Sequence, residues 1–222
     1  MGIYSVNDVR ISQAPSRLDL LLQYEPVLEF ILIHKELESI LNVGSSFGLS
    51  SVYTGSFSTV VELSSLTSKE QFDLVCAIDV LQYISPSDRN HFWNTLKQVT
   101  KRWALISIPI SHEMDIEILA MHMQGTNITL SETFLNVLSH PSPKTNLINE
   151  EIAEIGFRVI KEVSYEPRLA HYLTMLNNTV EGKWKIRVLN DIHRLNRAVS
   201  QHPEWPSYRT LWVLEVPLEC YQ

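Results

Sequence analysis

Two glycines follow the apolar segment at residues 40–43, and their spacing is typical of a turn that brings bare main chain against a ligand. The segment reads Ile-Leu-Asn-Val-Gly-Ser-Ser-Phe-Gly over residues 40–48, so the apolar run ends at Gly44 and Gly48 follows four residues later. Glycine adopts main-chain conformations that other residues avoid, and it has no side chain to keep a ligand away. Taken alone, this spacing indicates either a ligand-binding loop or a tight strand-to-helix turn.

A second segment places an acid at the end of another apolar run. Residues 72–84 read Phe-Asp-Leu-Val-Cys-Ala-Ile-Asp-Val-Leu-Gln-Tyr-Ile, which predicts a buried strand that ends at Asp79. Ligands of open α/β sheets bind beyond the carboxyl ends of the strands, so we expect Gly44 and Asp79 at one site. The alternative for Asp79 is to cap a following helix.

Apolar runs alternate with segments of helical spacing, which predicts an α/β protein with a mostly parallel sheet covered by helices on both faces. The strands are expected at residues 39–43, 58–63, 72–78, 103–108, 157–163 and 210–216. Helices are expected at residues 85–102, with the cations Lys101 and Arg102 at the C-terminus, and at 147–155, which ends at Gly156. Residues 16–35 are also helical in pattern, and Pro26 predicts a kink or a division into two helices.

The two opening segments resemble motifs of the class I S-adenosylmethionine-dependent methyltransferases. The Gly44–Gly48 loop is similar to the family's nucleotide-binding loop. Asp79-Val-Leu-Gln-Tyr83 is similar to the loop after its fourth strand, often Asp-Val-Leu-Glu-His. The resemblance extends roughly from Ser16 to Val216. It implies a single Rossmann-like methyltransferase domain over residues 1–222, with six or seven strands and an antiparallel C-terminal strand.

The resemblance also implies a cofactor, S-adenosylmethionine, and a set of residues that hold it: Asn42, Gly44, Ser46, Gly48, Glu62, Asp79 and Val80. Asn42 stands where the family usually has an acid, and Ser46 where it usually has a third glycine. Only residues 49–71 separate the two motifs, which is room for about one strand and a short helix. Glu62 then matches either the acid that holds the ribose or the one near the adenine, or it is a solvated strand-end residue.

Methyl transfer needs in-line alignment, and a hydroxyl acceptor also gains from a general base. His112 and His140 are the candidates for this base, with surface or capping roles as the alternative. The N-terminal helices 16–35 and the helical insertions 111–155 and 169–199 are expected to cover the substrate. These features favour methyl transfer to an oxygen or nitrogen of a small molecule or sugar. The alternative is a methyltransferase-like binding or assembly module without catalysis.

Composition and charge limit the kinds of partner and location that we expect for this protein. The 222-residue chain has a net charge of −7 and a pI of about 5.6, which argues against nonspecific binding to nucleic acid. We expect no membrane span and a cytoplasmic location, because no apolar run is long enough and no signal peptide is visible. No motif with metal-ligand spacing occurs, and Cys76 is expected to be a small core residue. A homodimer remains open.

Overall fold

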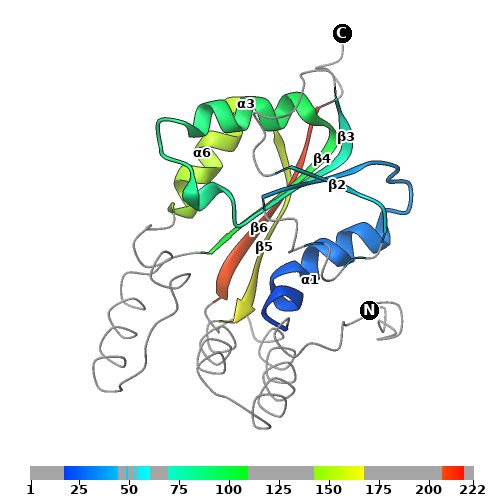
Figure 1. Ribbon diagram of the computed structural model, residues 1–222. Coiled ribbons are helices and arrows are strands. Elements are labelled where there is room, and N and C mark those ends of the chain that lie inside the picture. The colour runs from blue at the N-terminus through cyan, green and yellow to red at the C-terminus, as the bar shows by residue number, and fades with distance from the viewer. Residues whose placement is uncertain are drawn as a thin grey trace, which may run out of the picture.

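A computed structural model of the chain describes residues 18–44, 49, 53, 55–60, 70–109, 143–167 and 207–217. Within these residues a six-stranded sheet has the order β2-β1-β3-β4-β6-β5 (Figure 1). The strands are β1 (Ile40–Val43), β2 (Ser58–Val60), β3 (Phe72–Ile78), β4 (Thr100–Pro109), β5 (Arg158–Pro167) and β6 (Ser207–Glu215). Each of them lies where an apolar or alternating run predicts a strand.

The sheet is parallel through its first four strands and antiparallel at the end. β1 pairs in parallel with both β2 and β3, and β3 pairs in parallel with β4. β6 then runs antiparallel to β4 on one side and to β5 on the other. This confirms a mostly parallel α/β sheet with an antiparallel C-terminal strand. The expected total of six or seven strands stays a prediction, because parts of the chain lie outside the described residues.

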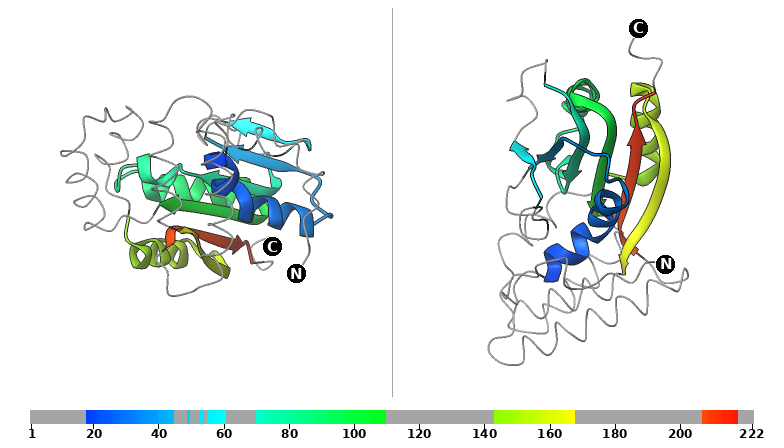
Figure 2. Two further views of the ribbon diagram at one scale, coloured as in Figure 1. Left: turned by 90° about the horizontal axis from the view of Figure 1, so that it is seen from below. Right: turned by 90° about the vertical axis from the view of Figure 1, so that its right-hand side faces the viewer.

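Helices cover both faces of the sheet (Figure 2). One face carries α1 (Leu18–Ile33), and the other carries α3 (Arg89–Val99) and α6 (Thr145–Ile155). Successive side chains of a strand point to opposite faces, so each strand serves both layers. Leu41 and Val43 accordingly pack on the side of α3 and α6, whereas Ile40 packs on the side of α1.

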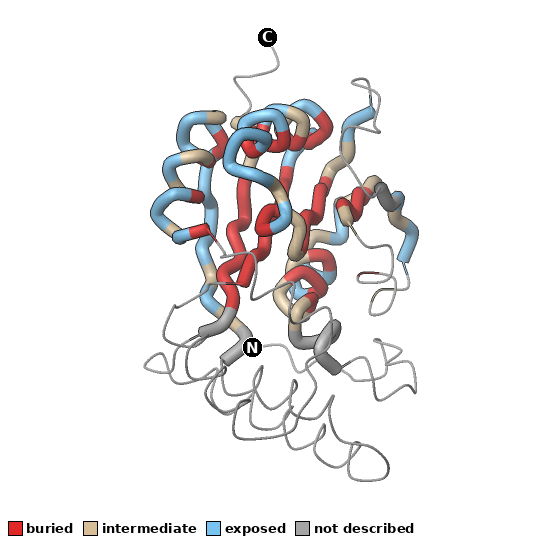
Figure 3. Tube along the Cα trace, turned by 60° about the vertical axis from the view of Figure 1, so that its left-hand side comes forward, coloured by how far each residue is buried: buried red, intermediate tan, exposed pale blue. Residues whose placement is uncertain are grey.

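Burial follows this layering closely (Figure 3). The central strands are buried along most of their length, whereas each helix buries only the side that faces the sheet. Cys76 lies in the α1-side core and is fully buried, as expected of a small apolar residue in a central strand. Trp93 and Trp212 are the largest buried side chains of the opposite core, and each donates its indole N–H to a side chain of α6.

Three sequence expectations about helix ends have different outcomes. Gly156 ends α6 in the left-handed conformation, at φ +78°, so the predicted helix terminus is confirmed. Pro26 lies inside one continuous helix, so its predicted division into two helices is wrong. The prediction that Lys101 and Arg102 end a helix is also wrong, because α3 stops at Val99 and β4 begins at Thr100.

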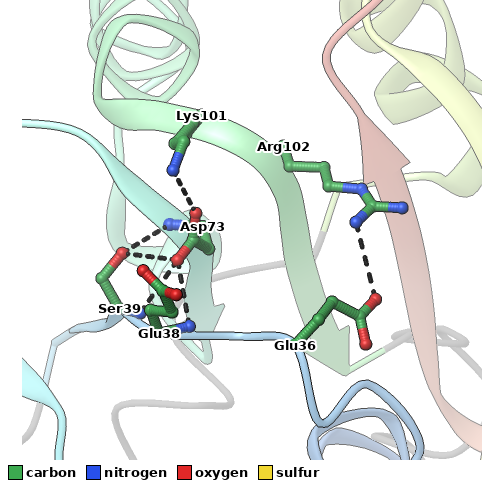
Figure 4. A network of polar contacts seen from close by, with 6 residues as sticks. All are labelled: Glu36, Glu38, Ser39, Asp73, Lys101 and Arg102. Atoms are coloured by element: carbon green, nitrogen blue, oxygen red, sulfur yellow. Dashed lines mark hydrogen bonds and ion pairs between the residues drawn. The ribbon is translucent and has the colours of Figure 1, made fainter.

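Those two cations belong to a polar network at the amino ends of β1, β3 and β4 (Figure 4). Asp73 Oδ2 accepts hydrogen bonds from the main-chain N–H groups of Glu38 and Ser39 and from Ser39 Oγ, each at 3.0 Å. Lys101 Nζ lies 2.8 Å from Asp73 Oδ1. Burial alone raises the pKa of Asp73, but Lys101 and these hydrogen bonds outweigh it and lower the pKa to about 2. The carboxylate therefore fixes the register of the strand starts.

Several expectations concern segments that the structure does not describe. They include the insertion at 169–199 and most of the insertion at 111–155. Within the latter, only α6, which packs on the sheet, and the two residues before it are described. The substrate-cover role of these segments and the extent of a single domain over 1–222 stay predictions. None of the helices in the described ranges is long and apolar enough to cross a membrane.

Candidate cofactor site

The sheet order defines where a ligand is expected. The chain passes from β1 to β2 on one side and then returns to β3 on the other side of β1. The strand order therefore reverses at β1, between its neighbours β2 and β3. In open α/β sheets the carboxyl ends of the strands at such a reversal form the ligand site. Gly44 follows the end of β1, and Asp79 and Val80 follow the end of β3.

Gly44 has the main-chain geometry that the sequence pattern predicts. Its φ of +100° lies in the region that side-chain-bearing residues rarely adopt. A Cβ atom built at this position would lie 3.0 Å from Val80 Cγ2. The Val80 side chain therefore lies close to the turn after β1. The conformation of Gly44 favours glycine, and any larger residue would also push the Val80 side chain aside by a few tenths of an ångström.

Asn42 lies in β1, two residues before Gly44. It pairs with Thr59 of β2 and Cys76 of β3 in the sheet register, and it is fully buried. Its position alternates with Leu41 and Val43, which places it on the α1 face of the sheet. Asn42 therefore brings a carboxamide, without a negative charge, into the interior next to the corner.

Asp79 is the most constrained residue of the site. It is the one non-glycine with positive φ among the described residues, at +56°, and its main-chain N–H donates to Ser107 O at 2.9 Å. Both guanidinium N–H groups of Arg209 donate to the carboxylate, that of Nη2 to Oδ2 at 2.9 Å, and the Gln23 amide donates to Oδ2 at 2.5 Å. The capping alternative does not apply, because the short helix Leu81–Tyr83 that follows has Val80 at its N-cap and no side-chain cap.

A strip of polar residues continues from Asp79 along the same edge of the sheet, where β4 and β5 end and the antiparallel β6 begins. Ser107 comes from β4, Arg209 from β6 and Tyr165 from β5. The Tyr165 hydroxyl donates to the main-chain carbonyl of Gln23 at 3.0 Å and lies 2.5 Å from Ser107 Oγ, which is then the donor of that second bond. In Figure 1, β5 ends beside the first turns of α1. Gln23 of α1 is thus held twice, by its side chain at Asp79 and by its main-chain carbonyl at Tyr165.

Two buried groups beside this strip keep their protons at neutral pH. Burial raises the pKa of the Tyr24 phenol, and the negative charge of Asp79 and the Cys76 thiol raise it further, while Arg209 opposes them. Burial also raises the pKa of the Cys76 thiol. Neither group is suited to act as a base or a nucleophile at neutral pH.

The structure thus brings together four of the residues predicted from the sequence: Asn42, Gly44, Asp79 and Val80. The remaining predicted residues lie outside the described parts of the chain: Ser46, Gly48, Glu62, His112 and His140. Sequence reasoning missed Gln23, Arg209 and Tyr165. Arg209 had a usable signal, since it is a charged residue directly before the apolar run of β6. Gln23 has no such signal. Among the described residues, no group of three or more His, Cys, Asp or Glu could hold a metal ion.

Comparison with solved structures supports the fold. The chain is similar to a SAM-dependent methyltransferase from Archaeoglobus fulgidus, with a TM-score of 0.50 and 15% identity over 89% of this chain and 94% of that one. A magnesium protoporphyrin IX methyltransferase from Synechocystis (TM-score 0.49, 10% identity, 98% and 89% covered) is also similar. So is a cyclopropane synthase from Mycobacterium tuberculosis (TM-score 0.47, 10% identity, 96% and 99% covered). No protein-family model and no curated protein matches the sequence.

At these identities the likeness establishes the fold alone, and the two structures with TM-scores under 0.5 add nothing to it. The chain is thus similar in fold to a SAM-dependent methyltransferase, and the resemblance of its two motifs to the class I family stays a prediction.

Proposed function

We propose that this protein binds S-adenosylmethionine and transfers its methyl group to an oxygen or nitrogen of a small molecule or glycan. The observation that carries this proposal is the contact between Gly44 and Val80 at the reversal of strand order in a methyltransferase fold. A corner made of bare main chain and one small apolar side chain fits a ligand that lies flat against the strand ends.

The residues present fit the cofactor at the end of the sheet that is described. Gly44 presents main chain without a side chain, Val80 offers an apolar contact, and Asn42 supplies a neutral carboxamide nearby. We expect these residues, together with Ser46, Gly48 and Glu62, to hold the methionine and adenosine parts. The bound cofactor supplies an activated methyl group on its sulfonium, so alignment by the protein is the main requirement.

The acceptor side of the proposal depends on residues outside the described ranges. We expect His112 or His140 to take the proton of a hydroxyl acceptor, because Asp79 is already engaged by Arg209 and Gln23. The insertions 111–155 and 169–199 would surround the acceptor. A small neutral acceptor such as a sugar matches a site whose one described carboxylate is paired with a cation.

Calorimetry with S-adenosylmethionine and S-adenosylhomocysteine tests the proposal. We expect the wild-type protein to bind both, and Gly44→Ala to weaken binding by about tenfold or more, equivalent to roughly 1.4 kcal/mol. Gly156→Ala is the matched control, because Gly156 also has positive φ, at +78°, but ends α6. Both substitutions strain the main chain, and only the first should affect binding. Absence of binding to wild type at millimolar concentrations would overturn the proposal.

One observation favours a second candidate, a methyltransferase-like binding module without turnover. The described sheet ends at the three-residue strand β2, so the described part of the side that holds the adenosine in the family is small. Such a module is expected to bind S-adenosylhomocysteine without consuming S-adenosylmethionine in the presence of hydroxylated or aminated sugars. Formation of S-adenosylhomocysteine, followed by mass spectrometry, separates this candidate from an enzyme.

A further inference from the structure

The corner of the candidate site depends on the main-chain conformation of one residue, Asp79. Its left-handed conformation is unfavourable for a residue with a side chain, by about 1 kcal/mol or more. This conformation turns the chain from β3 into the helix Leu81–Tyr83 and places Val80 against Gly44. Such a conformation persists only where the surroundings fix it, so the contacts of Asp79 determine the position of Val80.

Those contacts come from distant parts of the chain. Arg209 is 130 residues away and engages both carboxylate oxygens, and Gln23 is 56 residues away and engages Oδ2. Arg209 is itself fixed within β6, where it lies opposite Pro109 of β4 and Tyr165 of β5. A planar guanidinium that binds a carboxylate through two N–H groups sets the orientation of the carboxylate as well as its distance.

The same contacts remove Asp79 from the chemistry itself. Its charge is balanced by Arg209, whose side chain is 8% exposed, and its side chain is 24% exposed. Three hydrogen bonds from the guanidinium and the amide occupy most of the lone-pair sites of this carboxylate. We expect its influence on a ligand to pass through the main chain at Asp79 and Val80.

We propose that Arg209 is a positioning residue of the cofactor site. With Gln23 as second support, it holds Asp79 in its left-handed conformation and so keeps Val80 against Gly44. This inference rests on the proposed function, since the property it controls is the affinity for S-adenosylmethionine. It links α1, β3 and β6 to that affinity through a single residue.

The test compares four variants: Arg209→Met, Arg209→Lys, the double variant Asp79→Asn/Arg209→Met, and Arg89→Met as control. Arg89 is matched, since it is also 8% exposed and pairs with Glu151, 19% exposed, on the opposite face of the sheet. Unfolding by denaturant and calorimetry with S-adenosylhomocysteine are measured for each variant at a temperature where it is folded. The double variant leaves no buried charge unpaired, so it is expected to regain most of the stability that Arg209→Met loses.

Positioning predicts that affinity and stability separate in this series. We expect the double variant to bind at least about tenfold more weakly than wild type despite its recovered stability, and Arg209→Lys to lie between them. Arg89→Met should lose stability but keep its affinity within about twofold. Wild-type affinity in the double variant, or an equal loss in Arg89→Met, would overturn the inference while leaving the proposed function intact. Failure of wild type to bind would instead overturn the proposed function, and the positioning role with it.

Discussion

Strand β3 carries an aspartate near each end, and the two are held in different ways. Asp73, near the start, accepts hydrogen bonds from Glu38 and Ser39 of the adjoining segment and pairs with Lys101 of the adjacent strand. Asp79, just after the end, is held by Arg209 and Gln23 from distant elements. The first carboxylate is secured by its immediate neighbours, and the second by the assembled fold.

The main-chain conformation also differs between Asp73 and Asp79. Asp73 lies within the extended strand β3, at an irregularity in its pairing with β4, and its carboxylate joins the starts of β1, β3 and β4. Asp79 has φ +56° and leads into the turn that touches Gly44. Local, redundant hydrogen bonding is typical of a structural role, whereas a strained conformation held from several elements is typical of a functional site. We therefore expect the amino edge of this sheet to stabilise the fold, and the carboxyl edge to form the proposed site.

The largest effect that tests this contrast is on stability. Asp79→Ala leaves Arg209 buried without its carboxylate, and we expect a loss of about 3–5 kcal/mol in the free energy of unfolding. Asp73→Ala removes hydrogen bonds to a charged group but leaves Lys101, whose side chain is 58% exposed, free to hydrate, so we expect a loss of about 2 kcal/mol. Urea denaturation of both variants measures the difference. An equal or reversed order would contradict the distinction between the two edges.

The second effect is the dependence of stability on pH. Asp73 has a folded-state pKa of about 2, below its ordinary value of 3.8, so its ionised form favours the folded state. Its contribution is complete above pH 3.8 and is lost as the pH falls toward 2. We expect wild type to lose about 1–2 kcal/mol more stability than Asp73→Asn between pH 5 and pH 2. Urea denaturation at several pH values measures both curves, and parallel curves would show that Asp73 is not the group responsible.

Local sequence patterns predicted the strands and their end residues, but not the distant partners of those residues. The strands and the end of α6 were predictable because apolar runs and Gly156 report local conformation directly. Gly44 and Asp79 were found as strand-end residues for the same reason. The partners of Asp79 were not found, because a pair separated by 130 residues leaves no periodic pattern.

The error at the end of α3 has a physical cause of the same kind. Lys101 and Arg102 follow a helical pattern, and cations are favourable at a helix C-terminus. In the fold, β4 begins at once after Val99. Lys101 pairs with Asp73 of β3, and Arg102 pairs with Glu36 in the segment before β1. The Thr100 hydroxyl donates to Leu96 O at 2.6 Å, which allows a helix-to-strand junction without a loop. The pairing of β4 with its neighbouring strands outweighed the local preference of cations for a helix C-terminus.

A smaller effect is expected where α1 meets the strip of polar residues. Tyr165→Phe removes the hydroxyl that joins the Gln23 carbonyl and Ser107 Oγ, and it leaves buried Ser107 without this partner. We expect a loss of about 1 kcal/mol in the free energy of unfolding. Ser107→Ala/Tyr165→Phe should lose less than the sum of the single variants, because the unsatisfied Ser107 hydroxyl is then absent. Additive losses would show that the two hydroxyls are not coupled.

The smallest effect is expected from the substitution of Glu36, a carboxylate near Asp73 at the amino edge of the sheet. Glu36 Oε1 lies 3.5 Å from Arg102 Nη1, but both side chains are about half exposed. Figure 4 shows this pair beside the contacts of Asp73. The pKa of Glu36 is lowered mainly by its hydrogen bond with His34. Water replaces such exposed partners readily, and Arg102 keeps its contact with the Trp103 ring at 4.9 Å. Glu36→Gln should therefore leave urea denaturation unchanged at neutral pH. A loss as large as that of Asp73→Ala would mean that the whole amino-edge network acts as one unit, and that Asp73 is not its centre.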